Sequence, residues 1–199
     1  RIPKGSDGVM GISLIGISHH NTPLAVRELF AFPAERQQEL MKEMIARGIA
    51  EECVIISTCN RTEVYIYTAC PGGNFTELQD LVLEFAGAQD VENIGDYIRF
   101  YNGSKAVRHL FHVAAGLESM VMGEDQILGQ VKRAHDQARE TGTCGVYLNT
   151  LCGNGSQEGK DRNGSFQNQC IHCYYGHQSS RTGAGNPSWQ KSYDHRCIR

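Results

Sequence analysis

The sequence lacks the features of a membrane, secreted or strongly basic protein. None of its apolar runs is long enough to span a bilayer, and the N-terminus has no apolar core followed by a small-residue cleavage site. The formal net charge is -3, which argues against a basic coat for nucleic acid but leaves room for a local basic patch. These absences predict a soluble, cytoplasmic protein of one domain, or of one domain and a fragment.

The last quarter of the chain has almost none of the aliphatic residues that build a core. Residues 152–199 contain no Leu, Val or Met, and Ile171 and Ile198 are their only branched aliphatics. Such a segment cannot bury enough apolar surface to offset the entropy lost on ordering. We therefore expect a poorly ordered tail after Leu151.

The cysteines also lack the even distribution of a disulfide framework. Four are scattered over the first three-quarters of the chain, as in ordinary cytosolic proteins: Cys53, Cys59, Cys70 and Cys144. The other four lie in the last quarter, where CIHCYYGH could form a zinc knuckle around Cys170 and Cys173. One CxxC without a second, properly spaced pair is a weak indication of zinc, and we expect no metal site.

Residues 10–151, in contrast, read as a well-patterned globular domain. Strands are predicted at 11–17, 53–57, 63–67 and 97–101, and helices from about Pro33 to Gly48 and over 76–87. The order β-α-β-β-α-β is that of a split βαβ, or ferredoxin-like, sandwich of the α+β class, with an antiparallel sheet and two helices on one face. Two more helices should come after these, one capped by Ser104 and a longer one ending at Gly142.

The connection between the two middle strands carries unusual chemistry. Thr58, Cys59, Asn60 and Arg61 are too polar for a core and too reactive for a simple hairpin turn. Most free cysteines behave as small buried hydrophobes, but Cys59 lies beyond the strand among polar residues. Arg61 could lower the pKa of this thiol or bind a carboxylate with two parallel hydrogen bonds. Residue chemistry alone leaves a nucleophilic and a structural Cys59 both open.

Two other stretches combine histidines with polar residues. His109 and His112 are three residues apart on a predicted helix and share a face, and for at least one of them no role is the simpler interpretation. The polar residues after this helix are dense enough to suggest a lined pocket: Glu118, Ser119, Glu124, Asp125, Gln126 and Gln130. His19 and His20 come after the first strand, where either a site or a turn is plausible.

Three motifs in order and spacing carry a resemblance to a known family. GISHHNTPLAVRE, STCNRTEVY and HLFHVAAGLESMVMGEDQILGQVK are similar to glutamyl-tRNA reductase, the first committed enzyme of tetrapyrrole synthesis from glutamate. The resemblance covers about residues 10–151, which correspond to the N-terminal catalytic domain of that family and the start of the segment after it. Residues 1–9 precede the usual start of the family, and we expect them to form an unstructured leader.

The resemblance implies a mechanism and a set of site residues. Cys59 would attack the ester of glutamyl-tRNA(Glu) to give a thioester and free tRNA, and hydride from NADPH would reduce the thioester to glutamate-1-semialdehyde. A thiolate suits the first step because it is a strong nucleophile. Asn60 and Arg61 would recognise the glutamyl group, and His109 would assist catalysis, which leaves His112 without a role. The other substrate-site residues carried over are Thr58, Ser119, Glu124, Asp125, Gln126 and Gln130.

The resemblance also implies features that this chain does not show in readable form. The family binds NADPH in a Rossmann domain, but no G-x-G-x-x-G comes after a predicted strand here. We therefore expect the chain as written to carry only the thioester-forming half of the reaction. A homodimer and a partnership with glutamate-1-semialdehyde aminomutase are likewise implied for the full-length family. The alternative is a non-catalytic fragment that binds tRNA or a protein partner.

A frame error at about Leu151 would account for the unusual tail. If the codons that could encode residues 189–197 are read one nucleotide later, they permit Gly-Lys-Lys-Val-Met-Ile-Ile-Gly-Ala. That sequence has the pattern of a buried parallel strand that leads into a glycine turn, which is the pattern with which a Rossmann domain begins. We expect the DNA beyond codon 151 to contain a family-like reading frame displaced by one base. Sequencing the encoding DNA tests this, and the absence of such a frame would refute it.

Overall fold

The computed structural model describes residues 11–69, 75–118 and 126–157, with side chains through Cys152. Its strands are β1 (Ile12–Ser18), β2 (Glu52–Ser57), β3 (Arg61–Tyr67) and β4 (Arg99–Asn102). Its helices are α1 (Leu24–Leu29), α2 (Ala34–Ala46), α3 (Phe75–Ala86), α4 (Ile94–Tyr97), α5 (Ser104–Ala114), α6 (Gln126–Thr141) and α7 (Val146–Gln157). The leader over residues 1–9 and the zinc-knuckle motif lie outside these described residues.

The strands form one antiparallel sheet in the order β2-β3-β1-β4. This arrangement confirms the predicted ferredoxin-like order, and the short helices α1 and α4 lie in the connections between its main elements. Gly48 and Gly87 lie just beyond the ends of α2 and α3 with φ of +69° and +61°, values that a residue without a Cβ adopts at little cost.

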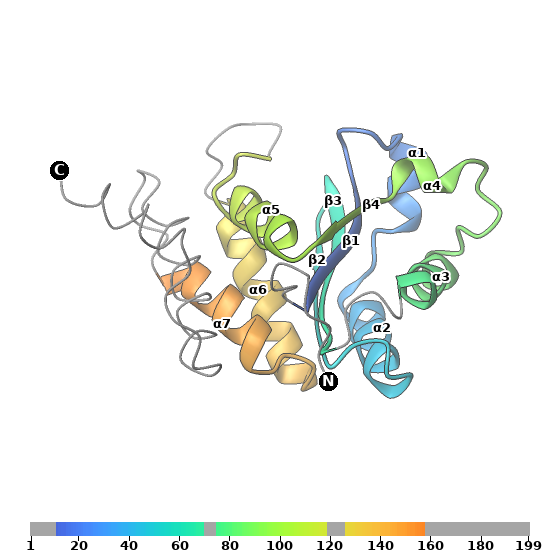
Figure 1. The fold of residues 1–199 in the computed structure, drawn as a ribbon. Coiled ribbons are helices and arrows are strands. Elements are labelled where there is room, and N and C mark those ends of the chain that lie inside the picture. The colour runs from blue at the N-terminus through green and yellow to red at the C-terminus, as the bar shows by residue number, and fades with distance from the viewer. Residues whose placement is uncertain (1–10, 70–74, 119–125, 158–199) are drawn as a thin grey trace, which may run out of the picture. The chain divides into compact units, whose positions relative to one another are not determined.

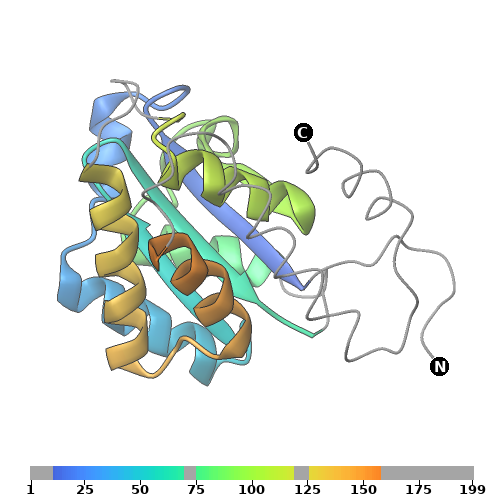
Figure 2. The same cartoon turned by 90° about the vertical axis from the view of Figure 1, so that its left-hand side faces the viewer.

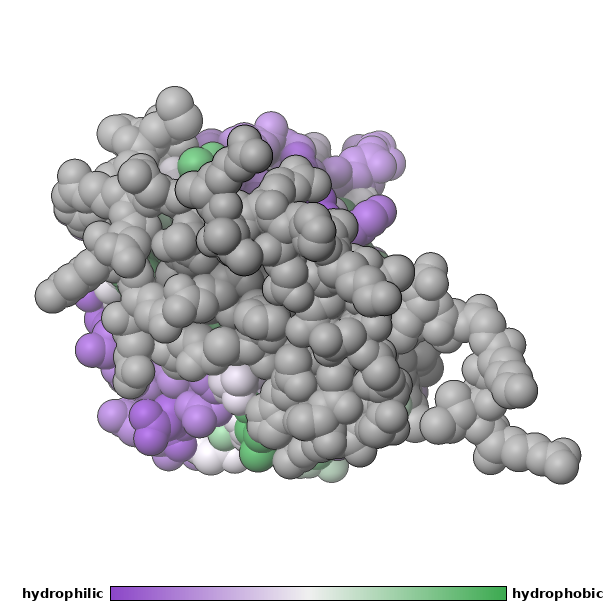
Figure 3. All heavy atoms as spheres, turned by 60° about the vertical axis from the view of Figure 1, so that its left-hand side comes forward, coloured by the Kyte–Doolittle hydropathy of each residue, from purple (hydrophilic) through white to green (hydrophobic). Residues whose placement is uncertain are grey.

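Helices cover both faces of the sheet. Figure 1 shows α2 and α3 on one side of the strands and α5, α6 and α7 on the other, and Figure 2 shows the second group in front of the sheet. Strand β3 is buried from Arg61 to Ile66, because α7 packs on it and His109 of α5 reaches Glu63. Hydrophilic residues dominate the coloured part of the surface in Figure 3, and apolar ones occur there in small patches.

Two local predictions differ from the structure. Ser104 is the first residue of α5 rather than its cap, because Gly103 with φ of +55° makes the turn into the helix. Helix α7 also crosses Leu151 and continues to Gln157. Its first turn is held by the buried carboxylate of Glu52 in β2, which accepts the backbone N–H groups of Tyr147 and Leu148 at 3.0 and 2.6 Å. The nature of the tail beyond this helix stays a prediction.

Neither a membrane span nor a metal site is found in the part of the chain that the structure describes. None of the helices there is both long and apolar enough to cross a bilayer. Within the same residues, no group of three or more His, Cys, Asp or Glu side chains could hold a metal ion.

Candidate active site

The turn between β2 and β3 presents Cys59 to solvent. Thr58 builds this turn: its Oγ1 accepts the backbone N–H groups of Asn60 and Arg61, both at 3.2 Å, and its own N–H donates to the Arg61 carbonyl at 2.8 Å. The threonine hydroxyl thus accepts two backbone N–H groups that the short turn would otherwise leave without a partner. The thiol therefore lies on a well-defined turn and is accessible.

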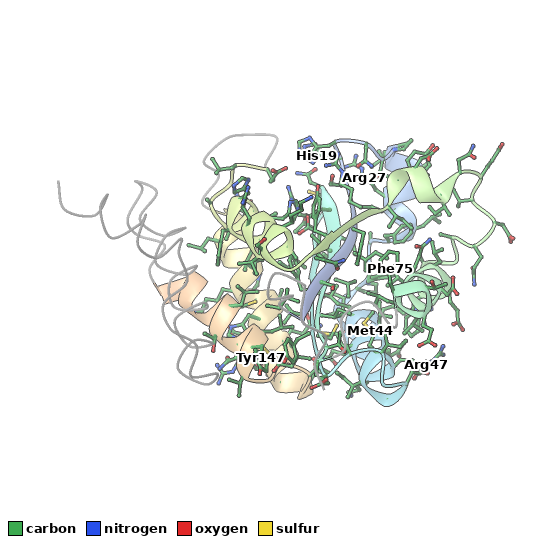
Figure 4. All side chains as sticks on the ribbon, in the orientation of Figure 1. His19, Arg27, Met44, Arg47, Phe75 and Tyr147 are labelled. Carbon is green, nitrogen blue, oxygen red and sulfur yellow. The ribbon has the colours of Figure 1, made fainter. Side chains whose placement is uncertain are left out.

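Two other segments hold the backbone of the turn from the side. The N–H of His19, in the connection after β1, donates to the Asn60 carbonyl at 2.8 Å. Arg27 Nη1, from α1, donates to the Cys59 carbonyl at 3.4 Å. Figure 4 shows His19 and Arg27 close to one another at this end of the sheet. The position of Cys59 thus depends on three segments.

A cluster of buried polar residues lies next to the turn on β3. Arg61, Glu63 and Tyr65 alternate along the strand and share one face. The Glu63 carboxylate accepts hydrogen bonds from Arg61 Nη1 at 3.0 Å and from the Tyr65 hydroxyl at 2.8 Å. His109 Nε2, from α5, lies 2.8 Å from Glu63 Oε1. Arg61 and Glu63 are each only 3% exposed.

This cluster determines the charge state of its members. Burial by itself would raise the pKa of Glu63, but hydrogen bonding and charge from His109, with Arg61 and Tyr65, lower that pKa below its usual value. Burial first, and then the Glu63 charge, raise the pKa of Tyr65 well above its usual range. Glu63 is therefore ionised and Tyr65 is a neutral donor. Because the ionised carboxylate accepts, His109 Nε2 is the nitrogen that carries a proton.

Glu118 connects this cluster to the histidines around it. Its backbone carbonyl accepts a hydrogen bond from Arg61 Nη2. Its carboxylate lies 3.2 Å from His20 Nε2 and 3.7 Å from His112 Nδ1. His112, to which the resemblance gave no role, is thus a half-exposed neighbour of Glu118. The connection after β1 and the segment after α5 meet at this carboxylate.

His19 and Arg27 each contain a buried nitrogen without a hydrogen-bond partner among the described residues. The atoms are His19 Nδ1 and Arg27 Nε. Burial first, and then the charges of His20 and Arg61, lower the pKa of His19. Its ring lies against that of His20, with centroids 4.0 Å apart. The His19 imidazole is therefore uncharged at neutral pH.

The structure brings about half of the predicted site residues together. Those in the turn and the cluster beside it are Thr58, Cys59, Asn60, Arg61 and His109. Gln126 is exposed and Gln130 is half-buried on α6, and no hydrogen bond among the described residues joins either to the cluster. Ser119, Glu124 and Asp125 lie outside the described residues.

Sequence reasoning missed Glu63, the residue that joins Arg61 to His109. A signal was available in the alternation of Arg61, Glu63 and Tyr65, which places opposite charges and a phenol on one face of a strand. This alternation indicates a charge cluster only if the face is buried, because solvent-exposed charge pairs contribute little to stability. Burial of this face depends on α7, which packs on β3, and on α5, which supplies His109, and both helices come much later in the chain.

Fold and site together define an α+β domain with an exposed cysteine beside a buried arginine–glutamate–histidine cluster. The family model described as "Glutamyl-tRNAGlu reductase, N-terminal domain" matches residues 15–163. The chain belongs to this family, which confirms the resemblance seen in its motifs.

Similar proteins agree with this assignment. The chain is 43% identical over 140 residues to the glutamyl-tRNA reductase of Desulforudis audaxviator, covering 70% of this chain and 31% of the relative. It is 38% identical over 144 residues to that of Chlorobaculum parvum, covering 72% and 33%. Among solved structures, the glutamyl-tRNA reductase from Methanopyrus kandleri matches with a TM-score of 0.62 and 32% identity, over 76% of this chain and 34% of that one. The chain spans about a third of the length of these relatives.

Replacing Glu63 tests whether the cluster holds the domain together. We expect Glu63→Gln to lower the free energy of unfolding at pH 7 by about 3 kcal/mol, because it leaves the buried Arg61 without its ionic partner. The folded-state pKa of Glu63 lies below its unfolded value of about 4.3. Its stabilisation is therefore complete above that value and lost as the pH falls through the lower, folded-state pKa. Urea unfolding at several pH values measures this.

The matched control for this prediction is Glu84→Gln on α3, an exposed carboxylate 3.7 Å from Arg47. Its effect should be within about 0.5 kcal/mol at every pH. A loss of stability in Glu63→Gln that is equally large at acid and neutral pH would contradict the charged role of Glu63.

Proposed function

We propose that this chain performs the acyl-transfer half of glutamyl-tRNA reduction. The Cys59 sulfur forms a bond to the ester carbonyl carbon of glutamyl-tRNA(Glu), and the bond from that carbon to the ribose oxygen breaks. The thiol proton ends on the released ribose oxygen, so the products are a glutamyl thioester and free tRNA. The observation that carries this proposal is the accessible Cys59 on a turn held from three sides, beside the buried cluster.

In this proposal His109 assists the proton transfer and Glu63 positions it. A carboxylate that accepts from one ring nitrogen determines the tautomer and the orientation of an imidazole. The 2.8 Å contact from Glu63 to His109 Nε2 has this form. The ring of His109 also lies against Tyr101, with centroids 5.1 Å apart, which further limits its movement.

Arg61, with Asn60 beside it, is proposed to recognise the glutamyl carboxylate. The Arg61 side chain is 2% exposed and already donates to Glu63 and to the Glu118 carbonyl. The substrate carboxylate would replace the Glu118 carbonyl, because a charged acceptor binds a guanidinium more strongly than a neutral one does. The remaining substrate-site residues stay proposals from the resemblance: Thr58, Ser119, Glu124, Asp125, Gln126 and Gln130.

The described residues do not fit NADPH. Their sheet is wholly antiparallel and contains no parallel strand that runs through a glycine-rich turn into a helix. We therefore assign the reduction to none of the residues that the structure describes. Synthesis of glutamate-1-semialdehyde by the full-length protein, a homodimer, transfer to an aminomutase and a cytoplasmic location are carried over from the family as proposals.

Acylation of Cys59 separates this function from a fragment that only binds tRNA or a protein partner. We expect the chain to acquire one glutamyl group when it is incubated with glutamyl-tRNA, and Cys59→Ser to acquire none. Intact-mass and peptide mass spectrometry measure the adduct. Cys144→Ser is the control: burial, with the nearby Glu52 charge, raises the pKa of that thiol to about 12, so its removal should change nothing. Retention of tRNA without an adduct would support the binding fragment instead.

Replacing Arg61 tests the proposed recognition of the carboxylate. We expect Arg61→Lys to lose most of the preference for glutamyl-tRNA over glutaminyl-tRNA, on the order of tenfold to a hundredfold, because an ammonium group cannot make the planar two-point contact. The measurement is the rate of Cys59 acylation by each substrate in both variants. Circular dichroism controls for folding. If the variant discriminates as well as the parent, another group recognises the carboxylate.

A further inference from the structure

Arg27 carries a positive charge that the described residues do not neutralise. Its Nη1 donates to the backbone carbonyl of Cys59 at 3.4 Å, and no carboxylate within the described residues lies in ion-pair distance of it. Its Nε is buried without a hydrogen-bond partner there. A buried donor is usually paired in a native protein, and an arginine stays charged at any ordinary pH.

One nitrogen of this guanidinium is left for an anion. Nη1 is engaged by the Cys59 carbonyl and Nε is buried, so the free donor is Nη2, to which no acceptor among the described residues bonds. A charged N–H donor of this kind makes a strong hydrogen bond to a phosphate or carboxylate oxygen. His19 beside it is uncharged at neutral pH, so Arg27 supplies the fixed charge on this side of the turn (Figure 4).

The two arginines next to the Cys59 turn differ in how deeply they lie. Arg61 approaches from β3 and its side chain is 2% exposed, whereas Arg27 approaches from α1 and is only half-buried. An acylated tRNA also presents two kinds of anion close to its ester: the glutamyl carboxylate and the phosphodiester of the terminal nucleotide. A small acyl side chain can enter a closed site, but a polynucleotide backbone cannot. The half-buried arginine therefore suits the phosphodiester.

We propose that Arg27 binds the phosphodiester of the terminal nucleotide of the tRNA acceptor end and so places the ester over Cys59. This inference rests on the function proposed above. In it Arg61 and Arg27 contact opposite sides of the reacting ester, one through its acyl group and the other through its nucleotide. The Arg27 contact to the Cys59 carbonyl links the bound phosphate directly to the backbone of the nucleophile.

The test compares Arg27→Gln with the parent in binding and in acylation. We expect affinity for uncharged tRNA, measured by fluorescence anisotropy, to fall on the order of tenfold. The slope of log affinity against log salt should decrease by about 0.7, the value for one phosphate of a single strand. Acylation of Cys59 by glutamyl-tRNA should slow to a similar degree. Acylation by an ester of glutamate with adenosine, which has no phosphate, should change less than about twofold.

The matched control is Arg36→Gln on α2. Arg36 also donates to a backbone carbonyl, that of Phe85 at 3.3 Å, and its removal costs the same single charge. It should leave both the salt slope and the acylation rates unchanged. Arg27→Lys should keep the salt slope while losing part of the affinity, because it retains the charge but not the fixed, directed N–H groups of the guanidinium.

Two results would overturn this inference while leaving the proposed function standing. Equal slowing of both esters would mean that Arg27 positions the Cys59 turn or recognises the glutamyl group. An unchanged salt slope in Arg27→Gln would mean that it contacts no phosphate. Conversely, a parent chain that binds tRNA through Arg27 but forms no adduct would support the phosphate contact and refute the acyl-transfer function.

Discussion

The buried carboxylate of Glu63 is the constraint on which the rest of the site depends. A charge in the interior of a sheet is tolerated only if it is paired and hydrogen-bonded. Here the partners come from the same strand, through Arg61 and Tyr65, and from α5, through His109. Loss of any one of them leaves a polar group unsatisfied in a region that excludes water. The carboxylate therefore holds α5 against the sheet in a specific orientation.

The hydrogen-bond network around Glu63 continues from the sheet to the surface beside the Cys59 turn. Arg61 bonds to both Glu63 and the Glu118 carbonyl, and the Glu118 carboxylate lies next to His20 and His112. Three separate segments are thereby joined beside Cys59. The thiol itself stays outside this network and remains accessible. The acyl transfer proposed above would benefit from this arrangement, because orientation of the reacting groups lowers the barrier.

Glu52, at the other end of the sheet, is a second buried carboxylate that binds a helix. Its buried carboxylate accepts two backbone N–H groups in the first turn of α7, where a negative charge is favourable. Gly145 permits this approach, since a Cβ at that position would overlap the Glu52 carboxylate. Two carboxylates from neighbouring strands, Glu52 and Glu63, thus each attach one helix of the layer that covers this face.

The sequence by itself determined the order of strands and helices and the place of Cys59. The β-branched run before Ser57 and the glycines at 48 and 87 act locally, so their effects can be read without the fold. Only the tertiary structure decided that Glu63 is the centre of the site and that Arg61 is buried. Both facts require contact with helices that come much later in the chain: α7 packs on β3, and α5 reaches it through His109. Such a contact joins segments far apart in the chain, and no local pattern of residues encodes it.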